Sequence, residues 1–154
     1  MKLSTKGRYA TLAMADLALS ARENLVTLGE ISTRQNISMP YLEQLFVKLR
    51  RSNLVVSVRG PGGGYRLAKP PYAIRIVDIL TAVEESVDAM SQGAGASGGL
   101  SGSKAQSMAN RLWEGLSAHV FVYLHQTRLS DVVENDLAPC PAVPTIFSVI
   151  SDTE

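Results

Sequence analysis

Apolar residues recur every three or four positions along much of the chain, and this spacing predicts helices. We expect a first helix over residues 5–21 and a second, of about two turns, after Thr27, which stands at capping-box spacing from Glu30. A third helix is expected to begin at Ser38, a candidate N-cap with a proline in the following turn. The core-facing stripe of this third helix is Leu42, Leu45, Phe46 and Leu49.

A β-hairpin is predicted directly after these helices. Residues 54–58 and 65–68 are short runs with strand character, and a Gly/Pro segment joins them. A buried helix is expected over residues 74–83 and a long one over about 105–127. The long helix carries a wide apolar stripe, formed by Met108, Leu112, Leu116, Val120, Tyr123 and Leu124 with Trp113 beside it. A helix of about 20 residues spans ~30 Å, more than this small domain needs, so we expect a partner helix.

The predicted fold is therefore mainly α with a small β-hairpin: a winged helix-turn-helix DNA-binding domain plus a long dimerisation helix. We divide the chain into a winged-helix DNA-binding domain at 1–69, a connecting helix at 70–89, a Gly/Ser loop at 90–107, the dimerisation helix and a short helix at 105–137, and a Pro-rich tail at 138–154. The loop is expected to be flexible, because glycine and serine bring little apolar surface to offset the entropy of ordering.

Charge separates the two halves of the chain, although the net charge is only +1. Residues 1–69 hold eleven lysines and arginines and four acidic residues. Residues 70–154 hold four lysines and arginines and ten acidic residues. The first half is thus +7 and the second −6, which indicates that the first half meets a polyanion. The single cysteine, and the lack of an apolar run long enough for a membrane span, predict a cytoplasmic protein without a membrane partner.

The outer face of the third helix carries the chemistry for reading DNA. Glutamine pairs with adenine, glutamate accepts from cytosine, and lysine and arginine bind phosphates. In the hairpin loop, glycines allow the backbone to approach DNA while an arginine contacts it. The candidate DNA-binding residues are Ser38, Tyr41, Glu43, Gln44, Lys48, Arg50, Arg51, Arg59, Gly60 and Gly62. The alternative interpretations are a solvated helix face with a merely structural turn, or a winged helix that docks an acidic protein and never reads DNA.

Catalytic and nucleotide-binding patterns are not apparent. The glycines at 60–64 lie between two strands and lack the Lys-Ser/Thr pair of a P-loop. His119 and His125 are six residues apart, about 240° around a helix, so they do not share a face. Asp16 in the first helix has the pattern of a structural carboxylate. We therefore do not expect an enzyme.

Three motifs resemble the family of bacterial winged-helix transcription regulators to which the iron–sulfur cluster regulator IscR belongs. They are residues 4–10 (STKGRYA), 41–46 (YLEQLF) and 57–65 (SVRGPGGGY), and residues 85–89 and Leu112-Trp113 match as well. The resemblance covers about residues 1–130. It implies a homodimeric regulator of iron–sulfur cluster biogenesis or iron homeostasis genes that binds double-stranded DNA at a pseudo-palindromic operator. The implied DNA contacts are Ser38, Tyr41, Glu43, Gln44 and Arg59.

The chain departs from this family at the cluster site. IscR-like proteins usually carry three cysteines in the loop before the dimerisation helix and a histidine just ahead of the Leu-Trp pair. Here residues 90–107 hold no cysteine, and Asn110 stands near the histidine position. One interpretation is an iron–sulfur cluster, [2Fe–2S] by the resemblance, with atypical ligation by Cys140 and non-cysteine ligands such as His119 or His125. The others are a pair of Cys140 residues acting together in the dimer, or loss of sensing. We expect protein purified in air to be largely apo.

Overall fold

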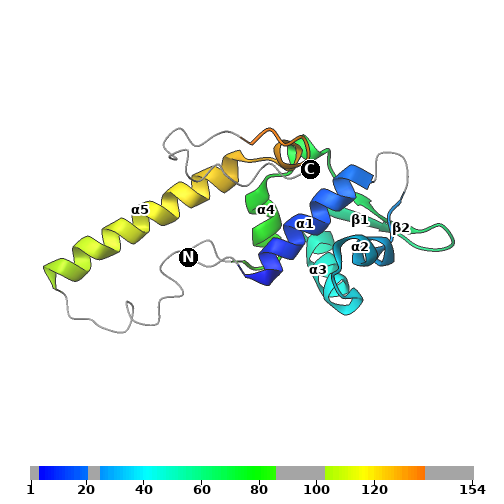
Figure 1. Cartoon of the computed structure of the whole chain (residues 1–154), viewed down its shortest axis with the longest axis horizontal. Coiled ribbons are helices and arrows are strands. Elements are labelled where there is room, and N and C mark those ends of the chain that lie inside the picture. The colour runs from blue at the N-terminus through cyan, green and yellow to red at the C-terminus, as the bar shows by residue number, and fades with distance from the viewer. Residues whose placement is uncertain (1–3, 21–24, 86–102, 138–154) are drawn as a thin grey trace, which may run out of the picture.

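The computed structural model describes residues 4–20, 25–85 and 103–137. Its elements in chain order are α1 (Thr5–Ser20), α2 (Leu28–Gln35), α3 (Met39–Arg51), β1 (Val55–Val58), β2 (Gly64–Leu67), the 3₁₀ helix η1 (Pro71–Ala73), α4 (Ile76–Ala82), α5 (Lys104–Gln126) and α6 (Leu129–Val133) (Figure 1). The predicted mainly helical fold with one β-hairpin is confirmed. The hairpin lies at one end of the molecule and α5 extends toward the other (Figure 1).

One hydrophobic core joins α1, α2, α3, α4 and the base of the hairpin. The stripe predicted on the third helix is buried in it, and Phe46 and Leu42 have no exposed surface. Leu129 of α6 and Ile74, just before α4, are also fully buried in this core. The spacing of apolar residues thus predicted correctly which face of α3 is buried. The opposite face of the helix is therefore the exposed one.

The ends of α2 and α3 follow from local chemistry. The Thr27 hydroxyl accepts from the Glu30 N–H at 3.2 Å, and the Glu30 carboxylate accepts from the Thr27 N–H at 2.7 Å, so the predicted capping box is confirmed. Asn36 then ends α2 in the left-handed conformation, with φ 53°. Ser38 is the N-cap residue of α3, but its hydroxyl makes no capping hydrogen bond.

The hairpin is fixed to α3 at its base. Strands β1 and β2 are antiparallel, with Ser57 opposite Tyr65. The backbone of Val26, in the connection before α2, adds two hydrogen bonds to Tyr65, at 3.0 and 2.7 Å. The Tyr65 ring also packs edge-on against Phe46, with 4.8 Å between ring centroids. The wing is therefore positioned by the same core that holds α3.

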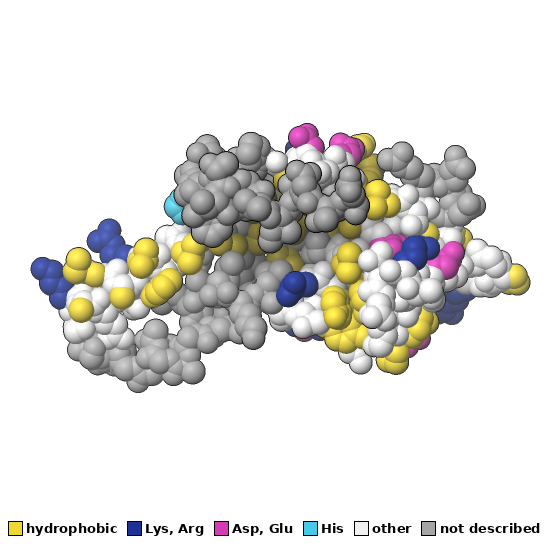
Figure 2. Space-filling view, in the orientation of Figure 1, with side chains coloured by type: hydrophobic (Ala, Val, Ile, Leu, Met, Phe, Trp, Pro, Cys, Tyr) yellow, Lys and Arg dark blue, Asp and Glu magenta, His cyan; other side chains and the backbone are white. Residues whose placement is uncertain are grey.

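Helix α5 differs from every other long element because none of its 23 residues is buried. Apolar side chains are visible along it in the space-filling view (Figure 2). Its C-terminal end meets the rest of the fold, where Leu124 packs against the core and an isolated β-bridge joins Arg75 to Arg128. Neither α5 nor any other helix in the described ranges combines the length and hydrophobicity needed to cross a bilayer.

Candidate nucleic-acid interface

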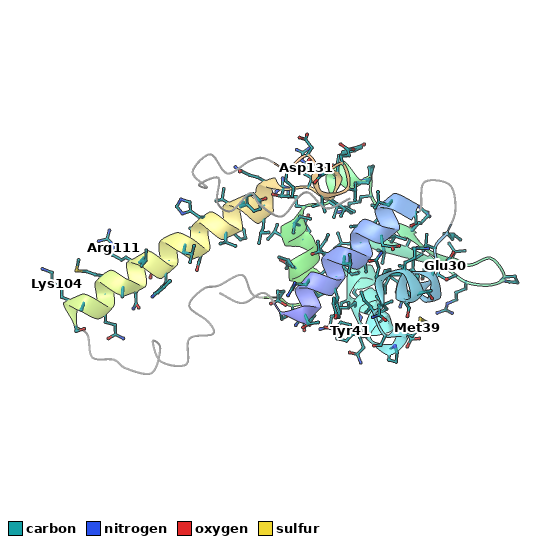
Figure 3. The ribbon with its side chains drawn as sticks, in the orientation of Figure 1. Glu30, Met39, Tyr41, Lys104, Arg111 and Asp131 are labelled. Carbon is teal, nitrogen blue, oxygen red and sulfur yellow. The ribbon has the colours of Figure 1, made fainter. Side chains whose placement is uncertain are left out.

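Three of the predicted DNA-binding residues on α3 have partners within the fold. The Tyr41 ring lies edge-on against Tyr9 of α1, with 5.7 Å between centroids. The Lys48 ammonium lies 2.6 Å from a carboxylate oxygen of Glu84. Arg50 extends toward the wing, where its Nη1 donates to the Ser57 hydroxyl at 3.4 Å. These contacts lie along the two edges of the exposed face of α3. In Figure 3, Met39 and Tyr41 lie at the lower edge of the molecule, at the N-terminal end of this helix.

The middle of that face is different. Glu43, Gln44 and Arg51 are exposed, and their side chains make no hydrogen bond or ion pair to any residue that the structure describes. Ser38, at the N-terminus of the same helix, is exposed and equally without a side-chain partner among the described residues. The structure therefore separates the candidates on α3 into an engaged group at the edges and a group along the middle that is available for a ligand.

The wing tip presents backbone rather than side chains. Gly60 and Gly62 have φ values of 101° and 72°, which side-chain-bearing residues rarely adopt, and open space surrounds both Cα atoms. At Gly63 a Cβ would lie 2.4 Å from the Val58 carbonyl oxygen. Arg59, at the start of this turn, is exposed. A polyanion can thus approach the backbone of the tip closely, with the exposed Arg59 guanidinium at the start of the turn.

Acidic residues at the end of α4 hold the edge of this surface together, a role that the sequence analysis missed. Glu84 has a left-handed φ of 59°, its carbonyl accepts from Lys6 Nζ at 3.2 Å, and its carboxylate pairs with Lys48. That hydrogen bond and the charge of Lys48 lower the pKa of Glu84. Burial alone would raise the pKa of Glu85, but hydrogen bonds from Ser4 outweigh it and lower that pKa.

Asp16 is structural, as predicted. Arg34 donates to its two carboxylate oxygens at 3.0 and 2.7 Å, and Gln35 donates as well, so α1 is fixed to α2. Burial would raise the pKa of Asp16, but the hydrogen bonds from Arg34 and Gln35, together with the Arg34 charge, outweigh it and lower the pKa. Asp16 therefore stays ionised within the fold and orients the two helices that precede α3.

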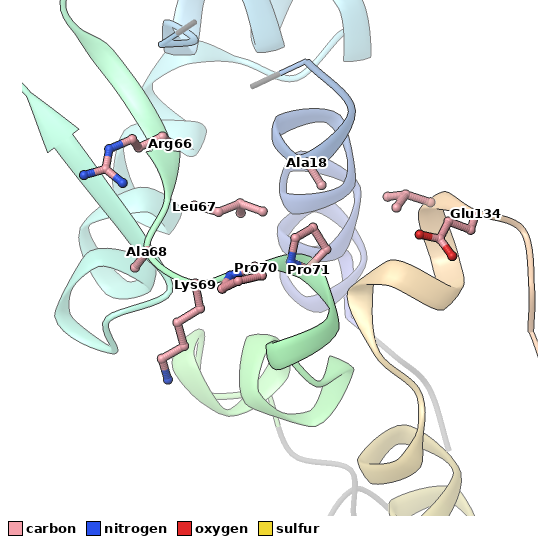
Figure 4. A pocket seen from close by; sticks show the side chains of 9 residues that line it. Ala18, Arg66, Leu67, Ala68, Lys69, Pro70, Pro71 and Glu134 are labelled. Atoms are coloured by element: carbon pink, nitrogen blue, oxygen red, sulfur yellow. The ribbon is translucent and has the colours of Figure 1, made fainter. Parts of the chain in front are cut away.

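A hollow of about 510 Å³ lies between the end of α1, the base of the wing and α6 (Figure 4). It is lined by Ala18, Arg66, Leu67, Ala68, Lys69, Pro70, Pro71, Val133 and Glu134. Most of these residues are apolar, and Glu134 is the single acidic group among them. The lining offers no pair of groups suited to general acid–base catalysis.

The described residues do not form an iron–sulfur site. They contain no group of three or more His, Cys, Asp and Glu side chains placed to hold a metal. His119 is bonded through Nδ1 to the Gly115 carbonyl at 2.8 Å, while His125 stacks on Phe121 and contacts Arg75. Cys140, the tail at 138–154 and most of the Gly/Ser loop lie outside the described residues. The two candidate histidines are thus not brought together with each other or with a described acidic ligand.

Comparison with known proteins identifies the family. A model of the Rrf2 family, described as an iron-dependent transcriptional regulator, matches residues 3–135. The chain belongs to the Rrf2 family. It is 66% identical over 154 residues to the HTH-type transcriptional regulator IscR of Cereibacter sphaeroides, covering 99% of both proteins. It is 47% identical over 133 residues to IscR of Vibrio cholerae, covering 86% of this chain and 75% of that protein.

Solved structures of Rrf2 proteins share the fold. CymR, the global cysteine regulator of B. subtilis, superimposes with a TM-score of 0.74 at 33% identity, covering 88% of this chain and 98% of that one. IscR of T. potens matches with a TM-score of 0.65 at 34% identity over 96% of both chains. The resemblance to IscR-like regulators and the winged-helix fold are confirmed. This Rrf2 protein is a transcriptional regulator and not an enzyme.

Proposed function

We propose that the protein is a homodimeric, sequence-specific DNA-binding regulator of iron–sulfur cluster biogenesis or iron homeostasis genes. The observation that carries this proposal is the exposed middle of α3, where Glu43, Gln44 and Arg51 lack partners among the described residues. The wing residue Arg59 is exposed as well. Amide and carboxylate groups on a helix of this kind read base edges in the major groove. The basic charge of residues 1–69 supplies the sequence-independent part of the affinity.

The dimer is proposed to form through α5. Its exposed large apolar side chains include Met108, Leu112, Trp113, Leu116, Phe121, Val122 and Tyr123. A helix with this much apolar surface in water is stabilised when a second copy covers it. A two-fold dimer places two α3 helices against the same duplex, and the operator is then pseudo-palindromic.

The proposal is tested by binding to a selected operator and to a random duplex of equal length at several salt concentrations. We expect selective, salt-dependent binding. Replacing Gln44 by Ala should cost about 1–3 kcal/mol on the operator and relax the preference at one base position. An equal loss on both duplexes would mean that Gln44 does not read a base. Absence of selective binding by the wild-type chain would favour a protein–protein module that docks an acidic partner.

Iron sensing rests on a separate proposal. We infer that any iron–sulfur cluster on this protein is held through Cys140, because it is the one thiol in the chain. Iron and sulfide are measured in wild-type and Cys140→Ser protein, both purified without oxygen. Loss of both in the variant, with the dimer and DNA binding intact, supports this ligand. Equal stoichiometric iron in the two proteins overturns it, and no iron in either favours a regulator that has lost sensing.

A further inference from the structure

Val47 is an apolar side chain among polar ones on the exposed face of α3. Its exposed fraction is 38%, and its neighbours one helical turn away are Glu43, Gln44, Arg50 and Arg51. Three of them, Glu43, Gln44 and Arg51, are the residues whose side chains lack partners among the described residues. Val47 therefore lies in the middle of the surface that the proposed function assigns to DNA.

Packing among the described residues does not account for this valine. Val47 belongs neither to the buried core cluster nor to the partly buried side chains packed against it. A β-branched residue on an exposed helix surface also slightly lowers helix propensity compared with the long polar residues around it. The side chain thus offers methyl groups to a partner outside the fold.

We propose that Val47 contacts the C5 methyl group of a thymine in the operator and is a specificity-determining residue for DNA reading. This inference rests on the proposed function, because it requires α3 to enter the major groove. The thymine methyl is the apolar group that B-DNA presents there, and apolar side chains are its usual partners. Glu43 and Val47 are separated by about 6 Å along the helix axis, so the proposed methyl contact is distinct from any contact of Glu43.

The test replaces each operator thymine in turn by deoxyuridine, which removes only the C5 methyl. Wild-type protein should lose about fourfold in affinity at one position per half-site, the transfer value of one methyl group. Val47→Ser removes both methyl groups and leaves a short polar side chain, so no methyl remains to contact the thymine. This variant should bind operators with thymine or uracil at that position with equal affinity. At every other position, the change in affinity on replacing thymine by uracil should be the same as for wild-type protein.

A matched control is Leu19→Ala, which removes an exposed apolar side chain near the C-terminus of α1. This variant should lose the same affinity as wild-type protein when the operator thymine is replaced by uracil. Two results overturn the inference alone: selective binding in which no thymine methyl matters, or Val47→Ser protein that still discriminates thymine from uracil fourfold. Equal wild-type affinity for operator and random duplex overturns the proposed function and this inference together. Circular dichroism of each variant verifies that the overall helix content is unchanged.

Discussion

Helices α1 and α5 show how differently two parts of this chain are stabilised. Helix α1 has 16 residues and buries Gly7, Ala10, Ala13, Met14, Asp16 and Leu17. Helix α5 has 23 residues and buries none, yet it carries larger apolar side chains. Burying one such side chain stabilises a structure by about 1.5–3 kcal/mol. The DNA-binding half thus obtains its stability within the chain, whereas α5 leaves its apolar side chains exposed for the proposed dimer.

The largest expected effect comes from placing a charge on the exposed face of α5. Leu116→Glu should disrupt the dimer, because burying an unpaired carboxylate at an apolar interface costs several kcal/mol. We expect a monomer in sedimentation velocity and loss of most operator affinity, with the DNA-binding half still folded. The control is Glu114→Gln, an exposed polar change on the same helix. A dimer that survives Leu116→Glu would place the interface elsewhere.

The second prediction concerns the packed half and its pH dependence. Asp16→Asn should lower the free energy of unfolding by about 2 kcal/mol at pH 7, because hydrogen bonds to a charged group are lost. The cost stays below that of breaking a fully buried pair, because 40% of the Arg34 side chain is exposed and can be hydrated. Urea denaturation measures the change.

The direction of the pH dependence follows from the lowered pKa of Asp16. A carboxyl with a lower pKa in the folded state contributes stability above its unfolded pKa of about 4, and this contribution is lost as the pH falls through the folded pKa. The difference in free energy of unfolding between wild-type protein and Asp16→Asn should therefore shrink at acid pH. Parallel stability curves for the two proteins would exclude Asp16 as the source.

The third prediction separates the wing from the helix. Arg59→Ala should weaken binding to operator and random duplex alike and lower the slope of log affinity against log salt by about one, because one phosphate contact is lost. Filter binding or anisotropy across a salt series measures this slope. An unchanged slope with weaker operator binding would instead indicate a minor-groove base contact by Arg59.

The smallest effect is expected at the edge of α3. Glu84→Gln should raise affinity for any duplex about twofold, because it frees Lys48, now 2.6 Å from the Glu84 carboxylate, to bind phosphate. The gain should vanish in a Lys48→Ala background. Glu134→Gln, at the C-cap of α6, makes the same charge change away from α3 and serves as the control. A gain that persists without Lys48 would assign the effect to net charge alone.

Local interactions explain what the sequence by itself determined. Thr27 and Glu30 of the capping box are three positions apart, and the stripe ending at Leu49 follows helical periodicity, so both are visible in the sequence. The glycines at 60 and 62 likewise predict a turn with positive φ, which the structure has at both positions. The start of α2, the hairpin and the buried face of α3 were therefore predictable, whereas α4 begins at Ile76 rather than at 74 and α5 begins at Lys104, within the predicted loop.

Contacts between distant residues were decided only by the tertiary structure. Lys48 meets Glu84 across 36 positions, and Val26 pairs with Tyr65 across 39, and no periodicity encodes either contact. These contacts determine which polar side chains of α3 are engaged and which remain available, and they leave Val47 exposed among the latter. The sequence names the residue types on a helix face, but the packing of other elements along its edges decides which of them a ligand can reach.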